Sequence, residues 1–211
     1  MTNETRQAIK ATVAVIAYFI LCCWAIWCFL HSKCALAQPV PTHADTLTMG
    51  TYSVVYRPDL RIPVTADWEV SRQFIGESQR EPSWRFAEDT RVSRPRATHQ
   101  DYTRSGYDRG HLCPAADRSR SKADMRTTFI MTNVCPQAPT LNRGEWKKLE
   151  TSCRNIARHG QALSVHVDVV FWPADTQRIG PNRVAVPHGF VKTVRDFLTD
   201  TICYSKYFQN M

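Results

Sequence analysis

The chain has 211 residues, of which 43% are hydrophobic and 22% are charged. This length and composition exclude bulk disorder and leave room for one domain of ordinary size after a leader segment. Residues 1–37 contain three cations and one carboxylate, a net +2, which leaves +6 of the total +8 for residues 38–211. A basic excess of this size suits a polyanionic partner such as nucleic acid, although many basic proteins bind none.

The first predicted element is an uncharged stretch of twenty residues, 11–30, which is long enough to cross a bilayer as a helix. Arg6 and Lys10 precede it, so the positive-inside rule sends the remainder of the chain across the membrane. Ala35-Leu36-Ala37 has the small-x-small form of a signal peptidase site. We therefore expect residues 1–37 to be a signal peptide or a retained signal anchor. The domain is then exported to the periplasm or the cell exterior, or it is anchored with its folded part outside the cytosol. The alternative for the stretch 11–30 is a helix buried in a soluble fold.

The remaining elements predict an α+β domain, with a central antiparallel sheet flanked by helices. Residues 38–49 are polar, contain prolines and are predicted to be a linker, so that the domain spans 50–211. Residues 76–106, rich in Arg, Ser and Pro, are predicted to form a long arm. Strands are expected at 52–56, 67–75, 129–133, 163–172 and 184–186, and helices at 141–159 and 190–198.

The helix predicted at 141–159 has two different faces. Its apolar stripe consists of Trp146, Leu149, Cys153, Ile156 and Ala157. Glu150 falls at the edge of this stripe, and Asn142 offers an amide oxygen near the start of the helix. Beside Glu150 the wheel places a contiguous basic face made of Arg143, Lys147, Arg154 and Arg158. We predict that this face contacts substrate phosphates; a solvated basic face is the alternative.

Residues 107–119 (YDRGHLCPAADRS) place Asp108, Arg109 and His111 within four positions. Phosphodiester hydrolysis needs a base for water and a cation facing the non-bridging oxygens. An imidazole titrates close to neutral pH, and a guanidinium contacts phosphate through its fork of donors. Gly110 is predicted to let the backbone turn tightly, so that both side chains could face one cleft. Taken alone, the four residues are equally compatible with a charged surface turn.

Further motifs follow the first one in a fixed order within 43 residues. Asp108-Arg109-Gly110-His111 is followed by Met131-Thr132-Asn133, Pro136-Gln137, Leu141-Asn142-Arg143-Gly144-Glu145-Trp146 and Leu149-Glu150. This combination resembles the DNA/RNA non-specific endonucleases of the ββα-metal (His-Me finger) superfamily. The resemblance is strong from about residue 102 to 154, and weaker from residue 52 and through 179–192.

The resemblance implies a ββα-metal nuclease site and metal-dependent cleavage of DNA and RNA that leaves 5′-phosphates. The implied cofactor is Mg²⁺, with Mn²⁺ as a substitute; such a hard cation keeps most of its waters, so one or two protein oxygens suffice. The implied roles are His111 as general base, Asn142 as direct Mg²⁺ ligand, Arg109 as phosphate contact, Glu150 as holder of metal-bound water, Asn133 as support and Asp108 as the residue that orients the motif. Family members usually continue beyond the region that matches 201–210, so this chain is expected to be short at its C-terminus.

The cysteines of the domain are Cys113, Cys135, Cys153 and Cys203. In an exported domain they could form two disulfides, in any of three pairings. Their spacing contains no C-x-x-C motif, so a structural zinc site is not expected. Cys113 lies two positions from His111, but no acyl-transfer motif surrounds them, which argues against a Cys–His nucleophile.

Two other classes of function compete with the enzyme. One is a degenerate nuclease-like domain that binds nucleic acid without cutting it, and the other is a membrane-tethered module whose basic face meets anionic lipid. Intact His111, Asn142 and Glu150 favour the enzyme, whereas the short C-terminus favours the binding domain. The expected partners are DNA and RNA. A homodimer, the membrane through an uncleaved N-terminal helix, and a separate inhibitor protein are further candidates.

Overall fold

The computed structural model describes residues 44–171 and 176–211. The predicted leader, including the apolar stretch 11–30, lies outside the described residues. Within them, no helix is long and apolar enough to cross a membrane.

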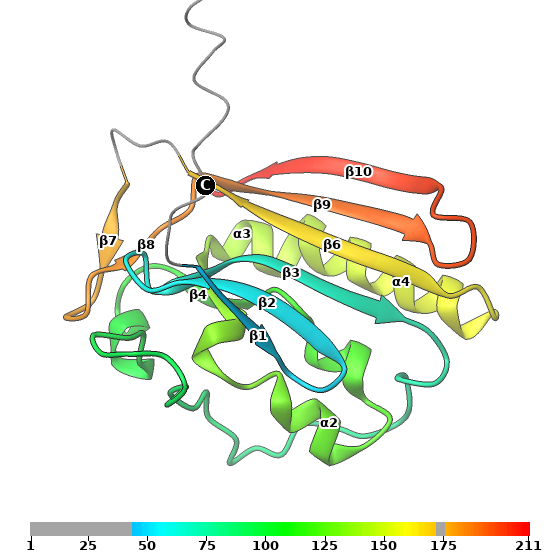
Figure 1. Cartoon of the computed structure of the whole chain (residues 1–211), viewed down its shortest axis with the longest axis horizontal. Helices are drawn as coiled ribbons and strands as arrows, with labels where there is room; N and C mark the ends of the chain where they lie inside the picture. Colours follow the sequence, from blue (N-terminus) through cyan, green and yellow to red (C-terminus); the bar gives the residue numbers. More distant parts are fainter. Residues whose placement is uncertain (1–43, 172–175) are drawn as a thin grey trace, which may run out of the picture. The chain divides into compact units, whose positions relative to one another are not determined.

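One antiparallel sheet of six strands, in the order β1-β2-β3-β6-β9-β10, is the frame of the domain (Figure 1). The strands are β1 (Asp45–Thr48), β2 (Tyr52–Arg57), β3 (Ile62–Val70), β6 (Leu163–Val170), β9 (Gly189–Asp196) and β10 (Ile202–Gln209). Buried and partly exposed residues alternate along β2 and along the first half of β6. Because successive side chains of a strand point to opposite faces, one face of the sheet forms the core.

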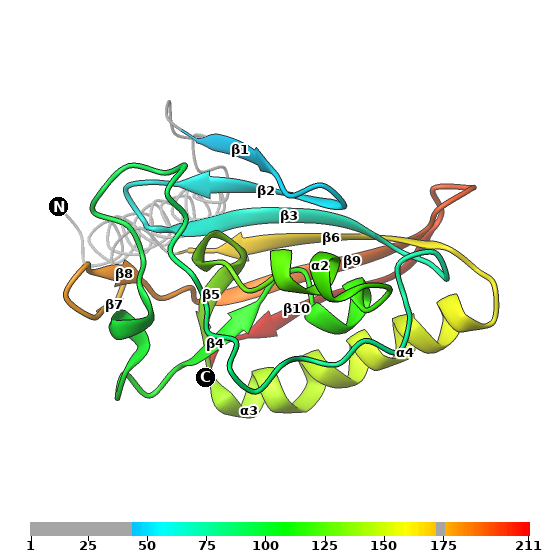
Figure 2. The ribbon, with the colours of Figure 1, turned by 90° about the horizontal axis from the view of Figure 1, so that it is seen from below.

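The covered face of the sheet carries the helices and a small two-stranded ribbon (Figure 2). The ribbon pairs β4 (Asp108–His111) with β5 (Val134–Gln137), and α2 (Lys122–Thr127) and α4 (Lys147–Arg158) lie on the same side. Trp146, at the start of α4, is fully buried and packs against Phe190 and Phe208 of the sheet, with ring centroids 5.3 and 5.5 Å away. The core therefore fixes α4 against the central and C-terminal strands.

The helix predicted at 141–159 is present with an interruption near its start. It begins with α3 (Pro139–Leu141), passes through a π-helical turn at Asn142–Trp146 and continues as α4. Pro139 occupies the first turn, where a missing N–H costs nothing. Gly144 has φ −98° and ψ −114°, which breaks the helical hydrogen-bond pattern just after Asn142.

Several predicted boundaries are wrong. The helix predicted at 190–198 is strand β9: its helix-like apolar spacing depends on Phe197 and Leu198, which lie in the following turn and are 49% and 89% exposed. The stretch predicted as a linker contains β1, which pairs with β2 at the edge of the sheet. The second strand starts at Ile62 instead of residue 67. The strand predicted at 129–133 is a 3₁₀ turn at Met131–Asn133 that leads into β5.

The other connections are short or irregular. Two short strands, β7 (Arg178–Ile179) and β8 (Val184–Ala185), form a separate hairpin. The arm predicted at 76–106 contains no named strand, and its regular structure is a 3₁₀ turn at His99–Tyr102. All four cysteines of the domain are free thiols, so the disulfides expected from their number are absent from the described residues.

Candidate functional site

Asp108 connects the start of β4 to the helix. Its Oδ2 accepts a hydrogen bond from Asn142 Nδ2 at 2.9 Å. Arg143 donates to both carboxylate oxygens, from Nε at 2.8 Å and from Nη2 at 2.6 Å. The Arg143 guanidinium holds the pKa of the Asp108 carboxyl below its usual value. These contacts give Asp108 the geometry of a residue that orients its neighbours.

Asn142 presents its amide oxygen. Because Nδ2 is used by Asp108, the orientation of the amide is set, and within the described chain Oδ1 has no hydrogen-bond partner. No group of three or more His, Cys, Asp or Glu side chains in the described segments could hold a metal ion. A metal at this corner would therefore depend on the Asn142 oxygen and on water, which fits a hard cation that keeps its hydration shell.

His111 lies in an aromatic environment at the other end of β4. Its ring centroid is 4.8 Å from that of Phe86 and 5.1 Å from that of Phe129. Its Nε2 is buried and has no hydrogen-bond partner. Burial, with a smaller effect of Arg80, lowers the pKa of His111 to about 4. The imidazole is therefore neutral at pH 7 and able to accept a proton.

A cavity of about 550 Å³ adjoins His111, and Arg80, Ser119, Phe129 and Arg158 are among the residues that line it. Arg80 comes from the arm, where the sequence singled out no individual arginine. Its guanidinium lies 5.0 Å from the centre of the Phe129 ring, and its Nη2 donates to the Trp84 carbonyl oxygen at 2.8 Å. Only the tertiary structure could place this charge beside His111.

Arg109 and His111 share one side of β4 because strand residues alternate. Arg109 Nη2 donates to the His99 carbonyl oxygen at 2.8 Å, and its guanidinium lies 5.4 Å from the centre of the Tyr102 ring. Gly110 lies within the strand, so the tight turn predicted there is wrong. The glycine is needed for space instead: a Cβ at this position would lie 2.3 Å from Oε1 of Gln137.

Asn133 fixes the chain directly after His111. The side chain is fully buried; its Oδ1 accepts from the Cys113 amide at 3.0 Å, and its Nδ2 donates to the carbonyl oxygens of Cys113 and Thr128 at 2.9 and 3.1 Å. The Leu112 amide also donates to the Asn133 carbonyl oxygen at 2.9 Å. The amide of Asn133 therefore supports the loop that carries His111.

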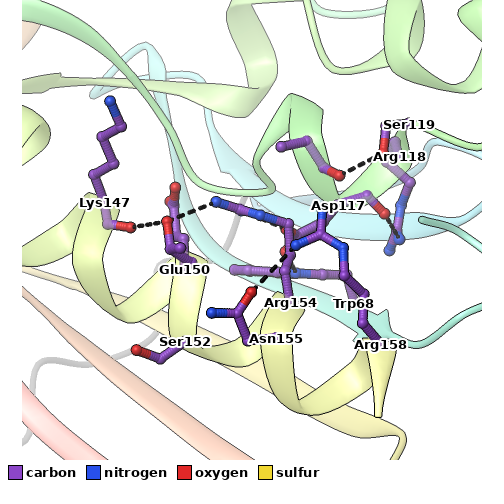
Figure 3. A network of polar contacts seen from close by, with 12 residues as sticks. Trp68, Asp117, Arg118, Ser119, Lys147, Glu150, Ser152, Arg154, Asn155 and Arg158 are labelled. Carbon is purple, nitrogen blue, oxygen red and sulfur yellow. Dashed lines mark hydrogen bonds and ion pairs between the residues drawn. The ribbon is translucent and has the colours of Figure 1, made fainter. Parts of the chain in front are cut away.

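Glu150 lies in a buried cluster of charges (Figure 3). Its Oε1 is 3.5 Å from Lys192 Nζ, and Lys192 is 1% exposed, with Nζ 3.5 Å from the centre of the Trp146 ring. Burial raises the pKa of Glu150 to about 7 and lowers that of Lys192. Glu150 makes no direct contact with Asn142 in the described residues, so its role in holding metal-bound water stays a prediction. Lys192 lies in the segment predicted as a helix, and no sequence signal marked it.

Arg154 does not belong to an exposed basic face, and that part of the prediction is wrong. Its Nη1 donates to Asp117 Oδ1 at 2.8 Å, while Asp117 Oδ2 accepts from Trp68 Nε1 at 2.9 Å, and both ions are buried. Arg143 is exposed but paired with Asp108. Figure 3 shows Lys147 pointing away from this cluster. Of the four predicted cations, Lys147 and Arg158 alone are exposed without a carboxylate partner in the described chain.

Comparison with protein families agrees with this arrangement. The model of the DNA/RNA non-specific endonuclease family matches residues 34–205. The chain belongs to this family.

Named relatives of the chain are nucleases. It is 37% identical over 131 residues to a nuclease of Nostoc sp., covering 61% of this chain and 48% of the relative. It is 34% identical over 165 residues to mitochondrial endonuclease G of Bos taurus, covering 74% and 55%, and 42% identical over 119 residues to the human protein, covering 52% and 40%. The chain thus spans about half the length of these relatives.

A solved structure shares the fold. The crystal structure of the EndoG/EndoGI complex, described as showing the mechanism of EndoG inhibition, superposes with a TM-score of 0.71 at 24% identity, over 81% of this chain and 76% of the other. The predicted α+β fold with a ββα unit is confirmed.

Proposed function

We propose that the protein is a metal-dependent endonuclease that hydrolyses phosphodiester bonds of DNA and RNA and leaves 5′-phosphates. The observation that carries this proposal is His111: a neutral imidazole with an unpartnered nitrogen, beside a cavity that Arg80 and Arg158 also line. A base and two cations around one cavity suit attack of water on a phosphate. The family and its named relatives support the same reaction class.

In the proposed reaction, His111 takes a proton from a water molecule as the water oxygen forms a bond to phosphorus. The bond from phosphorus to the 3′ oxygen breaks, and that oxygen takes a proton to become a hydroxyl. Arg80, Arg109 and Arg158 hold the phosphate oxygens. The products then carry a 5′-phosphate and a 3′-hydroxyl.

The proposed metal site is the Asn142 amide oxygen, and Mg²⁺ suits it, with Mn²⁺ as a substitute. When bound, a divalent cation neutralises negative charge on the phosphate. Asp108 accepts the hydrogen bond of the amide nitrogen, which would leave the amide oxygen free to hold the ion. Lys147, exposed on the first turn of α4, is proposed as a phosphate contact.

The decisive experiment incubates the purified chain with supercoiled plasmid and with RNA, with and without Mg²⁺. Cutting of both substrates only with metal, with 5′-phosphate ends on the fragments, is the expected result. A folded chain that binds DNA but never cuts it with Mg²⁺ or Mn²⁺ would favour the alternative, a binding-only relative.

We also propose that the domain lies outside the cytosol, on the strength of Arg6, Lys10 and the apolar stretch 11–30. A reporter fused after Met211 that works only in the cytosol would contradict this placement. Mass spectrometry of the N-terminus separates cleavage after Ala37 from a retained anchor. An inhibitor protein and a homodimer are proposed as partners, the inhibitor by analogy with the EndoG/EndoGI complex.

A further inference from the structure

Four arginines gather where the β2–β3 turn meets the β7–β8 hairpin, away from the residues that line the His111 cavity. They are Arg57, Arg61, Arg178 and Arg183. The carboxylate that acts on Arg178 in the described part of the chain is Asp59. Arg57 occupies that carboxylate with both arms of its fork, from Nε at 3.0 Å and from Nη2 at 2.5 Å. The other three guanidiniums therefore have no carboxylate of their own within the described residues.

Arg61 and Arg178 are held side by side by the same two carbonyl oxygens. Nη1 of Arg61 lies 3.5 Å from the Asp59 oxygen and 3.2 Å from the Arg183 oxygen. Nη1 of Arg178 lies 3.1 and 3.0 Å from the same two atoms. Burial, together with Arg61 and Arg183, lowers the pKa of Arg178. Two like charges that share the same carbonyl acceptors repel each other, so this arrangement favours the binding of an anion nearby.

Several guanidinium donors of Arg61 and Arg178 have no hydrogen-bond partner. Among the described residues, neither Arg61 nor Arg178 donates from Nη2 or Nε to any partner, and Arg61 Nε is buried. Arg61 and Arg183 also adopt left-handed backbone conformations, with φ of 61° and 54°. Such values are unfavourable for residues with a side chain. The corner thus combines two strained residues with uncompensated positive charge, a pattern that often marks a binding site.

We propose that the Arg61–Arg178 pair, flanked by Arg183, binds a phosphate of the nucleic-acid backbone at a second site outside the His111 cavity. This inference rests on the proposed function for the choice of nucleic acid. A guanidinium fork matches two phosphate oxygens at once, which an isolated ammonium cannot do.

The corner is tied to the catalytic strand through buried contacts. Asn182, in the β7–β8 hairpin, donates from its backbone amide and from Nδ2 to the two oxygens of Asp101, at 2.7 and 2.9 Å. Asp101 is 1% exposed and lies two residues after His99, whose carbonyl accepts from Arg109. The second site is therefore held in a fixed position relative to Arg109, as a polymer that touches both sites requires.

A lipid surface fits the corner less well. Large exposed apolar side chains of the described chain lie on α4, in the β9–β10 region and at Met211, and none lies in the β2–β3 turn or the β7–β8 hairpin. Membrane docking normally adds apolar insertion to charge attraction. The observations therefore favour a nucleic-acid backbone over anionic lipid.

The test measures the salt dependence of duplex binding with the full chain carrying His111→Ala, so that the DNA stays intact. Arg178→Gln is expected to lower the slope of log affinity against log salt by about 0.9 on a duplex of about 24 base pairs. The matched control is Arg94→Gln, which removes an equal charge from an arginine that is 74% exposed and paired with Glu88.

The melting temperature separates a ligand site from a structural role. Without DNA and at low salt, Arg183→Gln should melt at the wild-type temperature or above it, because the variant relieves repulsion with Arg178 and removes no side-chain hydrogen bond of the described residues. A structural role of the arginine predicts a lower melting temperature. If Arg178→Gln does not fold, Arg183→Gln serves instead, since Arg183 is exposed and its side chain makes no hydrogen bond within the described residues.

Three outcomes would overturn the second site: an unchanged slope on the duplex of about 24 base pairs, an equal loss of slope in Arg94→Gln, or a lower melting temperature of Arg183→Gln. Loss of binding to phosphatidylglycerol vesicles with normal duplex binding would assign the corner to lipid instead. Failure of the wild-type chain to cut DNA, with the slope change intact, would reject the proposed function and keep the site. Normal cutting by the wild-type chain, with no change of slope in Arg178→Gln, would keep the proposed function and reject the second site.

Discussion

The two strand histidines, His111 on β4 and His166 on β6, occupy opposite environments. His111 is partly buried against two aromatic rings, with its Nε2 shielded from solvent, and this desolvation lowers its pKa to about 4. His166 lies on the face of β6 opposite the buried Val165 and Val167. Its Nδ1 is 2.6 Å from Asp67 Oδ1 and its Nε2 is 3.0 Å from Asp168 Oδ1.

The hydrogen bonds that His166 donates to Asp168 and Asp67 raise its pKa to about 10. At pH 7 one imidazole is therefore a neutral base and the other a cation with both nitrogens occupied. The comparison shows that the surroundings, and not the residue type, decide which histidine can take a proton from water.

The largest expected effect comes from His111→Ala. Loss of a general base typically lowers the rate by about 10²–10⁴, and binding of the substrate should persist because the arginines remain. His166→Ala, the matched control on the open face, should keep the wild-type rate. Steady-state cleavage of plasmid DNA measures both. Full-rate cutting by the His111 variant would show that another group activates the water.

Lys192→Met tests the buried charges of the covered face. This variant removes the cation nearest to Glu150, and loss of one partner of a buried pair typically costs about 3–5 kcal/mol of unfolding free energy. Adding Glu150→Gln should recover a large part of that loss. Lys206→Met is the control, because Lys206 forms its 2.8 Å ion pair with Glu145 at the surface; that variant should unfold near the wild-type midpoint in urea. Equal destabilisation of the two variants would contradict the buried cluster.

Asp108→Ala should weaken the metal site without removing its ligand. The Asn142 amide loses the contact that orients it, and loss of such an outer contact typically lowers metal affinity by about 10–100-fold. Raising Mg²⁺ should recover the rate. Asp168→Ala, on the open face, should leave the Mg²⁺ requirement unchanged. The cleavage rate is measured as a function of Mg²⁺ concentration. If Asp108→Ala needs the same Mg²⁺ concentration as wild type, Asp108 does not support the metal site.

The smallest effects are those of pH on stability, and the two histidines should act with opposite signs. The folded-state pKa of His166 exceeds its unfolded value of about 6.5, so its contribution is complete below pH 6.5 and is lost towards pH 10. The folded-state pKa of His111 is lowered, so the contribution of His111 to stability is lost as the pH falls from 6.5 towards 4.

The His166 side chain is 36% exposed, and solvent screening should keep its share under about 1 kcal/mol. Urea unfolding of wild type and His166→Gln across pH 6–10 measures it. If the unfolding free energies of the two proteins change with pH in the same way, His166 does not contribute to the pH dependence of stability.

Local pattern was sufficient for much of the fold. Alternation predicted β2 and β6, and the apolar stripe predicted the helix that ends at Arg158. Pattern failed at 190–198, because Phe197 and Leu198 complete a helical repeat that the chain does not use. It also failed at Arg154, because a helical wheel shows which residues share a face and not what packs against that face.

By itself, the sequence determined the order of the motifs, the family they resemble and the α+β composition, and it singled out His111, Asn142 and Asp108 as predicted site residues. Only the tertiary structure decided which charges are free and which are paired. Arg154 donates to Asp117, which lies 37 positions before it in the sequence. Arg61 donates to the carbonyl oxygen of Arg183, which lies 122 positions after it and also accepts from Arg178. The physical reason is that periodicity encodes local geometry, whereas burial and Coulomb interactions depend on neighbours that only the folded chain brings together.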